Sequence, residues 1–308
     1  MIRIGLSGWA YKGWRGKFYP RGLPQRLELA HAAQRYGAIE INGTFYSLQR
    51  PASFRSWREQ TPHGFLFAVK GPRFITHMLK LRRARTPLAN FLASGVLGLE
   101  EKLGPILWQF PAALHFDEQR FEEFFSLLPR TTTAALTLAR EHDGRMKGRT
   151  WLEPVARRPL RHAVEIRHDS FCSPDFIQQL RRHRIGLVVA DTVDWPLLMD
   201  VTADFVYCRL HGSRQLYTSG YGPAALQDWA RRARAWGRGG EPRDARRVLP
   251  RSPIEPRGRD VFVFFDNDAK VRAPPDAAAL QALLKSAAAD RLPIPVPGGM
   301  ATPAACQR

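Results

Sequence analysis

The sequence predicts a single-domain α/β protein, a closed (β/α)8 barrel of TIM type. Eight short apolar segments recur along a chain of 308 residues, most are separated by helical patterns, and nearly all end in polar residues before a loop. Strands that alternate with helices pair in parallel through right-handed crossovers, and one such barrel commonly needs about 250 residues or more. An open doubly wound sheet is the alternative, but it would concentrate its polar residues at one switch point.

The first half of the chain is expected to contribute four strands and three helices. Strands are indicated by short apolar runs, and glycine or proline marks the turns between them. Gly37 fits the C-cap of the first helix, and Asp117 can cap the third, whose phenylalanines recur at helical spacing. The expected strands are 2–6, 38–42, 65–69 and 104–110, and the expected helices are 27–36, 54–60 and 117–128.

The second half begins with a segment, 131–160, that shows no clear period apart from a possible helical piece at 150–156. Pro223 suits the first turn of a helix, and an apolar stripe follows it. The expected strands are one beginning at Ala163, then 185–190, 205–211 and 261–265, and the expected helices are 175–184, one beginning at Pro223, and 276–288.

The domain organisation follows from these elements. Residues 1–290 are expected to form the barrel, with an insertion at about 237–260 that is rich in Arg, Gly and Pro and reads as a mobile basic loop. The Pro- and Gly-rich tail, residues 291–308, is expected to be disordered.

Composition limits the class of protein. The apolar fraction of 44% and the charged fraction of 24% are ordinary for a globular protein. No apolar run approaches the ~18 residues of a membrane span, no secretory leader is apparent, and the three cysteines form no CxxC pair. We therefore expect a cytoplasmic protein without a membrane partner, and nothing indicates its oligomeric state.

The net charge of +19 is unusual. Such a charge attracts polyanions, nucleic acid above all, in a salt-dependent manner. The alternative is compositional, because arginine greatly outnumbers lysine, as a GC-rich genome would produce.

The candidate site is the mouth of the barrel, where the C-terminal ends of strands and their loops converge. Alternation within strands places polar side chains on one face; Glu165 and Arg167, for example, share a side. The expected ring comprises Glu40, Asn42, Lys70, Gln109, Glu165, Arg167, Asp191, Arg209, His211 and Asp266, with Tyr46, His77, His168, Tyr217, Tyr221 and Asn267 on loops around it.

These residue types suggest an enzyme that acts on a phosphorylated or other anionic substrate, such as a phosphodiester or sugar phosphate. Lys70, Arg167 and Arg209 would hold the anion. Glu165 or Glu40 would act as base and His211 as acid, with Asp191 as a further candidate. The structural alternative is that the interior charges only pair with one another and close the barrel, although burying several charges is unfavourable unless each is paired.

Cofactors have little support. Glu40, Glu165, Asp191, His211 and Asp266 could bind a divalent metal, but no HxH, HExxH or CxxC motif anchors such a site. The cations at the same mouth favour an anion instead. No Walker A loop or Rossmann glycine motif indicates a nucleotide cofactor.

A second hypothesis is a nucleic-acid-binding protein without catalysis. In it the basic insertion would contact phosphates, and Trp9, Trp14 and Tyr221, expected to be exposed, would stack on bases.

Several motifs together resemble the YecE-like family, a domain of unknown function (number 72). They are GLSGWAYKGWRGKFYP, IEINGTFYSL, FAVKGPRFITH, LGPILWQFP, AVEIRHDSF, VVADT, DFVYCRLHGS and FVFFDND, in this order between Ile2 and Leu284. The resemblance implies a TIM-type barrel and no established reaction. The chain departs from the family pattern after FVFFDND, where Val271, Arg272 and Asp276 replace the expected Gly and Asn, and the insertion looks expanded.

Overall fold

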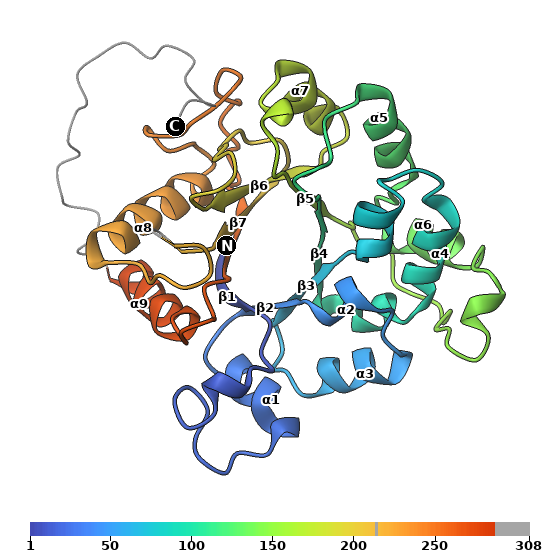
Figure 1. The fold of residues 1–308 in the computed structure, drawn as a ribbon, viewed down its shortest axis with the longest axis horizontal. Coiled ribbons are helices and arrows are strands. Elements are labelled where there is room, and N and C mark those ends of the chain that lie inside the picture. Colours follow the sequence, from blue (N-terminus) through green and yellow to red (C-terminus); the bar gives the residue numbers. More distant parts are fainter. Residues whose placement is uncertain (213–214, 287–308) are drawn as a thin grey trace.

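Eight strands form a closed barrel in the computed structural model, which describes residues 1–212 and 215–286. Every strand pairs in parallel with the next, and β8 pairs with β1 to close the ring (Figure 1). The predicted TIM-type barrel is therefore confirmed. The strands are β1 (Ile2–Ser7), β2 (Ala38–Ile41), β3 (Leu66–Lys70), β4 (Leu103–Gln109), β5 (His162–Glu165), β6 (Gly186–Asp191), β7 (Phe205–Leu210) and β8 (Asp260–Phe265).

The helices form a layer outside this ring (Figure 1). Local signals explain several of them: the Asp117 side chain accepts a hydrogen bond from Arg120 N at the start of α5, as predicted, and prolines begin α3, α7 and α8. The α-helices of the described residues are α1 (Glu28–Ala33), α2 (Gly43–Tyr46), α3 (Pro51–Glu59), α4 (Arg85–Ala93), α5 (Glu118–Leu127), α6 (Thr132–Ala139), α7 (Pro174–Arg182), α8 (Pro223–Gly237) and α9 (Ala273–Lys285).

The segment 131–160 differs from its prediction. Its helix is α6, where the Thr131 side chain accepts a hydrogen bond from Ala134 N and the helix buries Ala135 and Leu138. The helical piece predicted at 150–156 is wrong, because this stretch is extended and passes along the helices toward β5. Pro154 explains the error, since it lacks an N–H and disfavours helical geometry in the residue before it.

The interior of the barrel has an apolar lower layer and a polar upper layer. Small residues from β2, β3 and β5 face aromatic residues from β7 and β8 in the lower layer, so the volumes complement one another. Toward the C-terminal ends of the strands, the buried residues at the same alternating positions are polar. The lower layer contains Ala38, Ala68, Leu107, Ala163, Val188, Ala190, Phe205, Tyr207, Phe262 and Phe264.

The basic insertion connects α8 to β8, so it lies at the N-terminal end of the barrel, opposite the mouth. Its backbone is tied to the rest of the chain through Asp200, which accepts hydrogen bonds of 2.9 Å from Val248 N and Leu249 N. Within the insertion, Arg259 donates to the carbonyls of Gly239 and Pro253. The predicted tail, 291–308, lies outside the described residues. Within the described ranges there is no helix with the length and apolar character needed to cross a bilayer.

A glycine substitution tests how firmly the insertion is anchored. Gly239 has φ +84°, and an added Cβ would lie 1.8 Å from the carbonyl oxygen of Glu255. We expect Gly239→Ala to lower the free energy of unfolding by about 2–3 kcal/mol, because the side chain adds both backbone strain and a clash. Urea denaturation measures this change. Gly144→Ala is the control, since its Cβ would meet nothing within 4 Å among the described residues; equal effects of the two substitutions would contradict the prediction.

Candidate functional site

Arg209, on β7, is the centre of a buried ion cluster beneath the mouth of the barrel. Its guanidinium donates to Glu40 (Nε–Oε2 3.1 Å, Nη2–Oε1 2.9 Å), to Asp266 Oδ2 (2.8 Å) and to Glu165 Oε2. It also donates to Ser7 Oγ at 3.1 Å, and only 1% of Arg209 is exposed. We call Arg209 with Glu40, Glu165 and Asp266 the carboxylate hub; it joins β7 to β2, β5 and the end of β8.

The hub controls the ionisation of its acids. Burial by itself would raise the pKa of Glu165, but the guanidiniums of Arg209 and Arg167 outweigh this and hold its pKa well below the ordinary value. Burial also opposes ionisation of Asp266, yet Arg209 and His211 lower its pKa. Glu40 accepts further hydrogen bonds of 2.6 Å from Ser7 Oγ and from the Tyr207 hydroxyl. All three acids of the hub are therefore provided with partners as carboxylates.

His211 fills the space between two acids of the hub. Its Nδ1 lies 3.0 Å from Asp266 Oδ2 and its Nε2 lies 3.6 Å from Glu165 Oε2, and neither contact is a hydrogen bond. The ring is completely buried between Trp195 and Tyr217, which meet it edge to face.

The position that a cation would take among these acids is filled by the guanidinium of Arg209. In the described ranges no group of three or more His, Cys, Asp or Glu side chains could hold a metal ion. The donors of Arg209 are taken by the hub and its side chain is not among those that line the cavity above, so its contact with a ligand stays a prediction.

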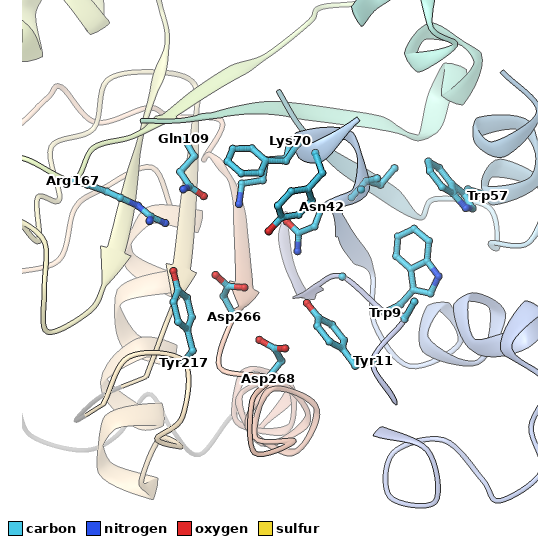
Figure 2. Close-up of a pocket in the computed structure, with 16 residues that line it drawn as sticks. Trp9, Tyr11, Asn42, Trp57, Lys70, Gln109, Arg167, Tyr217, Asp266 and Asp268 are labelled. Carbon is cyan, nitrogen blue, oxygen red and sulfur yellow. The ribbon is translucent and has the colours of Figure 1, made fainter. Parts of the chain in front are cut away.

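A cavity of about 640 Å³ lies above the hub at the mouth of the barrel (Figure 2). We call it the mouth cavity. Its walls come from the ends of strands β1–β5 and β8 and from the loops that follow β1, β2 and β7. The residues labelled in Figure 2 are Trp9, Tyr11, Asn42, Trp57, Lys70, Gln109, Arg167, Tyr217, Asp266 and Asp268.

Lys70 brings a buried ammonium group to this cavity. It is 8% exposed, and its Nζ lies 4.6 Å from the centre of the Phe45 ring, a cation–π contact. Nζ makes no hydrogen bond or ion pair with a residue that the structure describes. Burial, together with the charge of Arg209, lowers the pKa of Lys70 to about 8. An anion in the cavity would supply the partner that this ammonium lacks.

Arg167 brings a second cation. Its Nε and Nη2 donate to Glu165 Oε1 at 2.9 and 2.8 Å, and its guanidinium carbon lies 3.7 Å from the centre of the Trp195 ring. These contacts fix the plane of the group, which points into the cavity (Figure 2). Nη1 has no protein partner among the described residues, so it can donate to a ligand.

Asp268 is a site residue that the sequence analysis missed. Burial, and then the charge of Asp266, raise the pKa of Asp268 to about 6. Figure 2 shows both carboxyl groups at the cavity wall, between Tyr217 and Tyr11. Tyr11 donates to the Ser7 carbonyl at 2.5 Å, and burial followed by the charge of Asp268 raises its pKa. Asp268 lies in the turn after β8, beyond the reach of strand alternation, and its sequence signal is its place two residues after Asp266.

Most of the predicted residues lie at or directly below the mouth cavity. Lys70, Asn42, Gln109, Tyr46, Arg167, Tyr217 and Asp266 line it, and Glu40, Glu165, Arg209 and His211 lie beneath it. His77 lies beside it, with its ring edge to face with Phe45 at 5.1 Å. Burial and the charge of Arg167 lower the pKa of His77 to about 4.

Four other predicted residues have their contacts away from the mouth cavity. Asp191 faces outward from β6, where it accepts a hydrogen bond of 3.2 Å from Trp229 Nε1, because the interior position of that strand belongs to Ala190. Asn267 donates to Asp276 (2.8 Å), and the Tyr221 hydroxyl accepts from Gly212 N (3.1 Å). His168 lies against His115, with ring centres 3.8 Å apart.

The aromatic residues also differ from expectation. Trp14 and Tyr221, predicted to be exposed, are 1% and 6% exposed and belong to the outer core. Trp9 does line the mouth cavity, and it meets Trp57 edge to face at 5.4 Å. Trp57 comes from α3, and no local pattern links it to Trp9; only the folded chain brings the two together.

Comparison with known proteins gives a family and a fold. The model of a family described as "Protein of unknown function DUF72" matches residues 3–298. The UPF0759 protein YecE of Escherichia coli is 32% identical over 112 residues, which are 36% of this chain and 38% of that protein. The UPF0759 protein YunF of Bacillus subtilis is 30% identical over 76 residues, or 25% and 26% of the two chains. The chain thus spans less than two fifths of the length of these curated relatives.

Two crystal structures of DUF72 family proteins are similar in fold. The protein from Thermotoga maritima has a TM-score of 0.70 and 23% identity, over 93% of this chain and 100% of that chain. The protein from Enterococcus faecalis has a TM-score of 0.62 and 17% identity, over 93% and 96%. At these identities the similarity shows the barrel fold alone.

Proposed function

The chain belongs to the DUF72 family of proteins of unknown function, and from its mouth cavity we propose that it is an enzyme that acts on a phosphorylated or other anionic substrate with the help of proton transfer. A sugar phosphate or a phosphodiester suits two cations that face a polar cavity. Lys70 and Arg167 hold the anion. Asp268 donates a proton to the oxygen on which negative charge develops and becomes a carboxylate, while Asp266 stays ionised beside it.

The observation that carries this proposal is the separation of proton affinities in two neighbouring acids. The pKa of Asp266 is lowered and that of Asp268 is raised to about 6, although both line the same cavity. Two carboxyl groups with separated pKa values are typical of sites that need one acid and one charged group near neutral pH. A carboxyl group with a pKa of about 6 can take up and release a proton close to neutral pH, and a barrel that only paired its charges would have no use for one.

The hub has a positioning role in this proposal. Glu165 fixes Arg167 through two hydrogen bonds to one oxygen, and Arg209 holds the other oxygen of Glu165. Glu165, Glu40 and His211 lie beneath the cavity. They therefore influence a bound substrate through the residues above them. The acid role expected of His211 passes to Asp268.

The alternative, binding of nucleic acid through the basic insertion, has less support. The insertion lies at the end of the barrel opposite Trp9, and Trp14 and Tyr221 are buried. One strand of nucleic acid would have to reach both ends of the barrel to use the insertion and the mouth together.

Binding of inorganic phosphate tests the anion site. We expect Lys70→Met to weaken binding by roughly 10- to 100-fold in isothermal titration calorimetry, since a hydrogen bond to a charged group is worth about 1.5–3 kcal/mol. Wild-type affinity should fall as the pH rises through about 8, because Lys70 then loses its proton. This alkaline loss should be absent in Lys70→Met.

Lys285→Met is the matched control, since Lys285 is exposed at the end of α9. It should bind phosphate as the wild type does. If Lys70→Met and the control bind phosphate equally well, the anion site is not in the mouth cavity and the proposal fails.

A further inference from the structure

A second hollow adjoins the mouth cavity. It has a volume of about 610 Å³ and shares Phe45 and Tyr46 with the mouth cavity, so these two residues lie between the hollows. Its other walls are the loops that follow β2 and β3, the start of α4, and the turn at residues 143–149. We call it the side groove. A ligand that occupied both hollows would pass over Tyr46, which is 71% exposed.

The side groove has an apolar floor and exposed aromatic rings. Ile75, Leu79 and Met146 contribute to the floor. Tyr46 is 71% exposed and Phe74 is 38% exposed, which is unusual for large rings on a protein surface. Planar faces at these positions are available for stacking.

Arginines surround this floor. Arg50, Arg83, Arg145 and Arg149 line the groove, against one acid, Asp143. Arg145 lies 3.8 Å from Asp143, whereas Arg50, Arg83 and Arg149 form no ion pair with any residue in the described ranges. All four are exposed. The groove thus presents unpaired guanidinium groups beside bare aromatic rings.

The wall that carries Phe74 and Arg83 is strained. Residues Phe74–Met78 form a turn of π-helix, and Lys80, Leu81 and Arg83 have φ values of 49°, 71° and 48°. Left-handed geometry at residues other than glycine costs about 1–3 kcal/mol each, and such strain is concentrated at ligand-binding segments. Strain of this kind is expected in a wall that binds a ligand.

We propose that the side groove binds the continuation of a single-stranded nucleic acid whose reacting phosphodiester lies in the mouth cavity. This inference rests on the proposed function and names its substrate class. Rings stack on bases while guanidiniums contact phosphates, which is the combination that single-strand binding requires. A duplex does not fit as well, because its base faces are already stacked and its backbone offers nothing to an apolar floor. Each hollow lies within the ~300–1,000 Å³ range of small-ligand sites, so together they can hold more than one nucleotide.

The test compares two arginine pairs with the same loss of charge. Fluorescence anisotropy of a labelled dodecathymidylate measures the strand, and competition by inorganic phosphate measures the mouth cavity. We expect Arg83→Ala with Arg149→Ala to weaken dodecathymidylate binding roughly 10-fold and to reduce the slope of log K against log salt by about 1.4. The control pair, Arg243→Ala with Arg257→Ala, lies in the basic insertion, is exposed, and should change binding little.

The aromatic contribution is tested separately. Phe74→Ala should weaken dodecathymidylate binding roughly 10-fold, and Phe74→Tyr, which keeps the ring, should restore it. Phosphate competition should be the same in these variants as in the wild type, and a dithymidylate should bind more weakly than the dodecamer. Thermal melts check that each variant is folded.

Three results would overturn the side groove as the binding site. They are equal loss of affinity in the two arginine pairs, equal affinity for the dinucleotide and the dodecamer, or full affinity in Phe74→Ala. Failure of the proposed function gives a different result. If the mouth cavity is not the anion site, Lys70→Met leaves competition by phosphate unchanged. The comparison of the two arginine pairs still shows whether the side groove binds the strand.

Discussion

Replacing Arg209 by methionine is expected to lower the free energy of unfolding by about 3–5 kcal/mol at neutral pH, the usual consequence of removing one side of a buried ion pair. The variant leaves Glu40, Glu165 and Asp266 beneath the mouth cavity without the guanidinium that pairs with all three. Methionine fills much of the volume of the arginine side chain, so the loss of stability reflects the missing charge rather than a cavity. Urea denaturation followed by far-ultraviolet circular dichroism measures it.

The effect has a definite pH dependence. In the wild type the pKa values of Glu165 and Asp266 are lowered by folding, so the stability they add is present above their unfolded values and is lost as the pH falls through the folded values. Without Arg209, the largest charge that opposes the effect of burial is gone, so both pKa values rise toward or above their ordinary range. The difference between variant and wild type should therefore be largest at neutral pH and smaller near pH ~4.

Arg85→Met is the matched control for this prediction. Arg85 forms a two-bond pair with Glu141 (2.8 and 2.7 Å), but both side chains are exposed, and such pairs contribute little. If Arg209→Met unfolded at the same urea concentration as Arg85→Met, the hub would not be a stabilising cluster.

Replacing Asp268 by asparagine is expected to have opposite effects on turnover and on stability. If Asp268 is the proton donor, turnover should fall by about 10²- to 10⁴-fold, the range for general acids. The wild-type rate should fall as the pH rises through about 6, where Asp268 loses its proton, and this dependence should be absent from the variant. Turnover is measured by nuclear magnetic resonance on a panel of sugar phosphates and short oligonucleotides.

The free energy of unfolding of Asp268→Asn should exceed that of the wild type by about 1 kcal/mol at neutral pH. The gain is small because the side chain keeps contact with water, which screens its charge. The pKa of Asp268 is raised by folding to about 6, so the wild type loses stability as the pH rises through that value. Below pH ~4 the gain should vanish. Glu153→Gln, at an exposed acid, is the control and should change neither property. A variant that is less stable and fully active would refute the role of Asp268.

The barrel and its interior could be predicted because they depend on local alternation. Glu40, Lys70, Glu165, Arg209 and Asp266 all follow the two-residue period that places side chains inside a strand ring. The same rule shows why Asp191 was misplaced: it belongs to the outward phase of its strand, in which Ala190 is the inward residue. Asp268 lies in the turn after β8, where the period no longer applies, so alternation does not find it.

The depth of each residue could not be predicted from the sequence. Alternation gives a face but not a height along the barrel, so Arg209 in the hub and Arg167 at the cavity looked alike. Loop residues present a further limit, because Trp9 and Trp57 meet only after the loop following β1 has packed beside α3. The side groove likewise joins Tyr46, Phe74 and Arg149 from distant segments, and none of them belongs to a common pattern.

The hub limits which amino-acid substitutions the interior of this barrel can tolerate. Its acids come from three strands and its base from a fourth, so a substitution at any one of them leaves an unmatched charge in the interior. Effects of substitutions within such a cluster are not additive. An apolar plug of similar volume could serve stability as well, but only after several positions had changed together. We therefore expect the four residues to be replaced together and not one at a time.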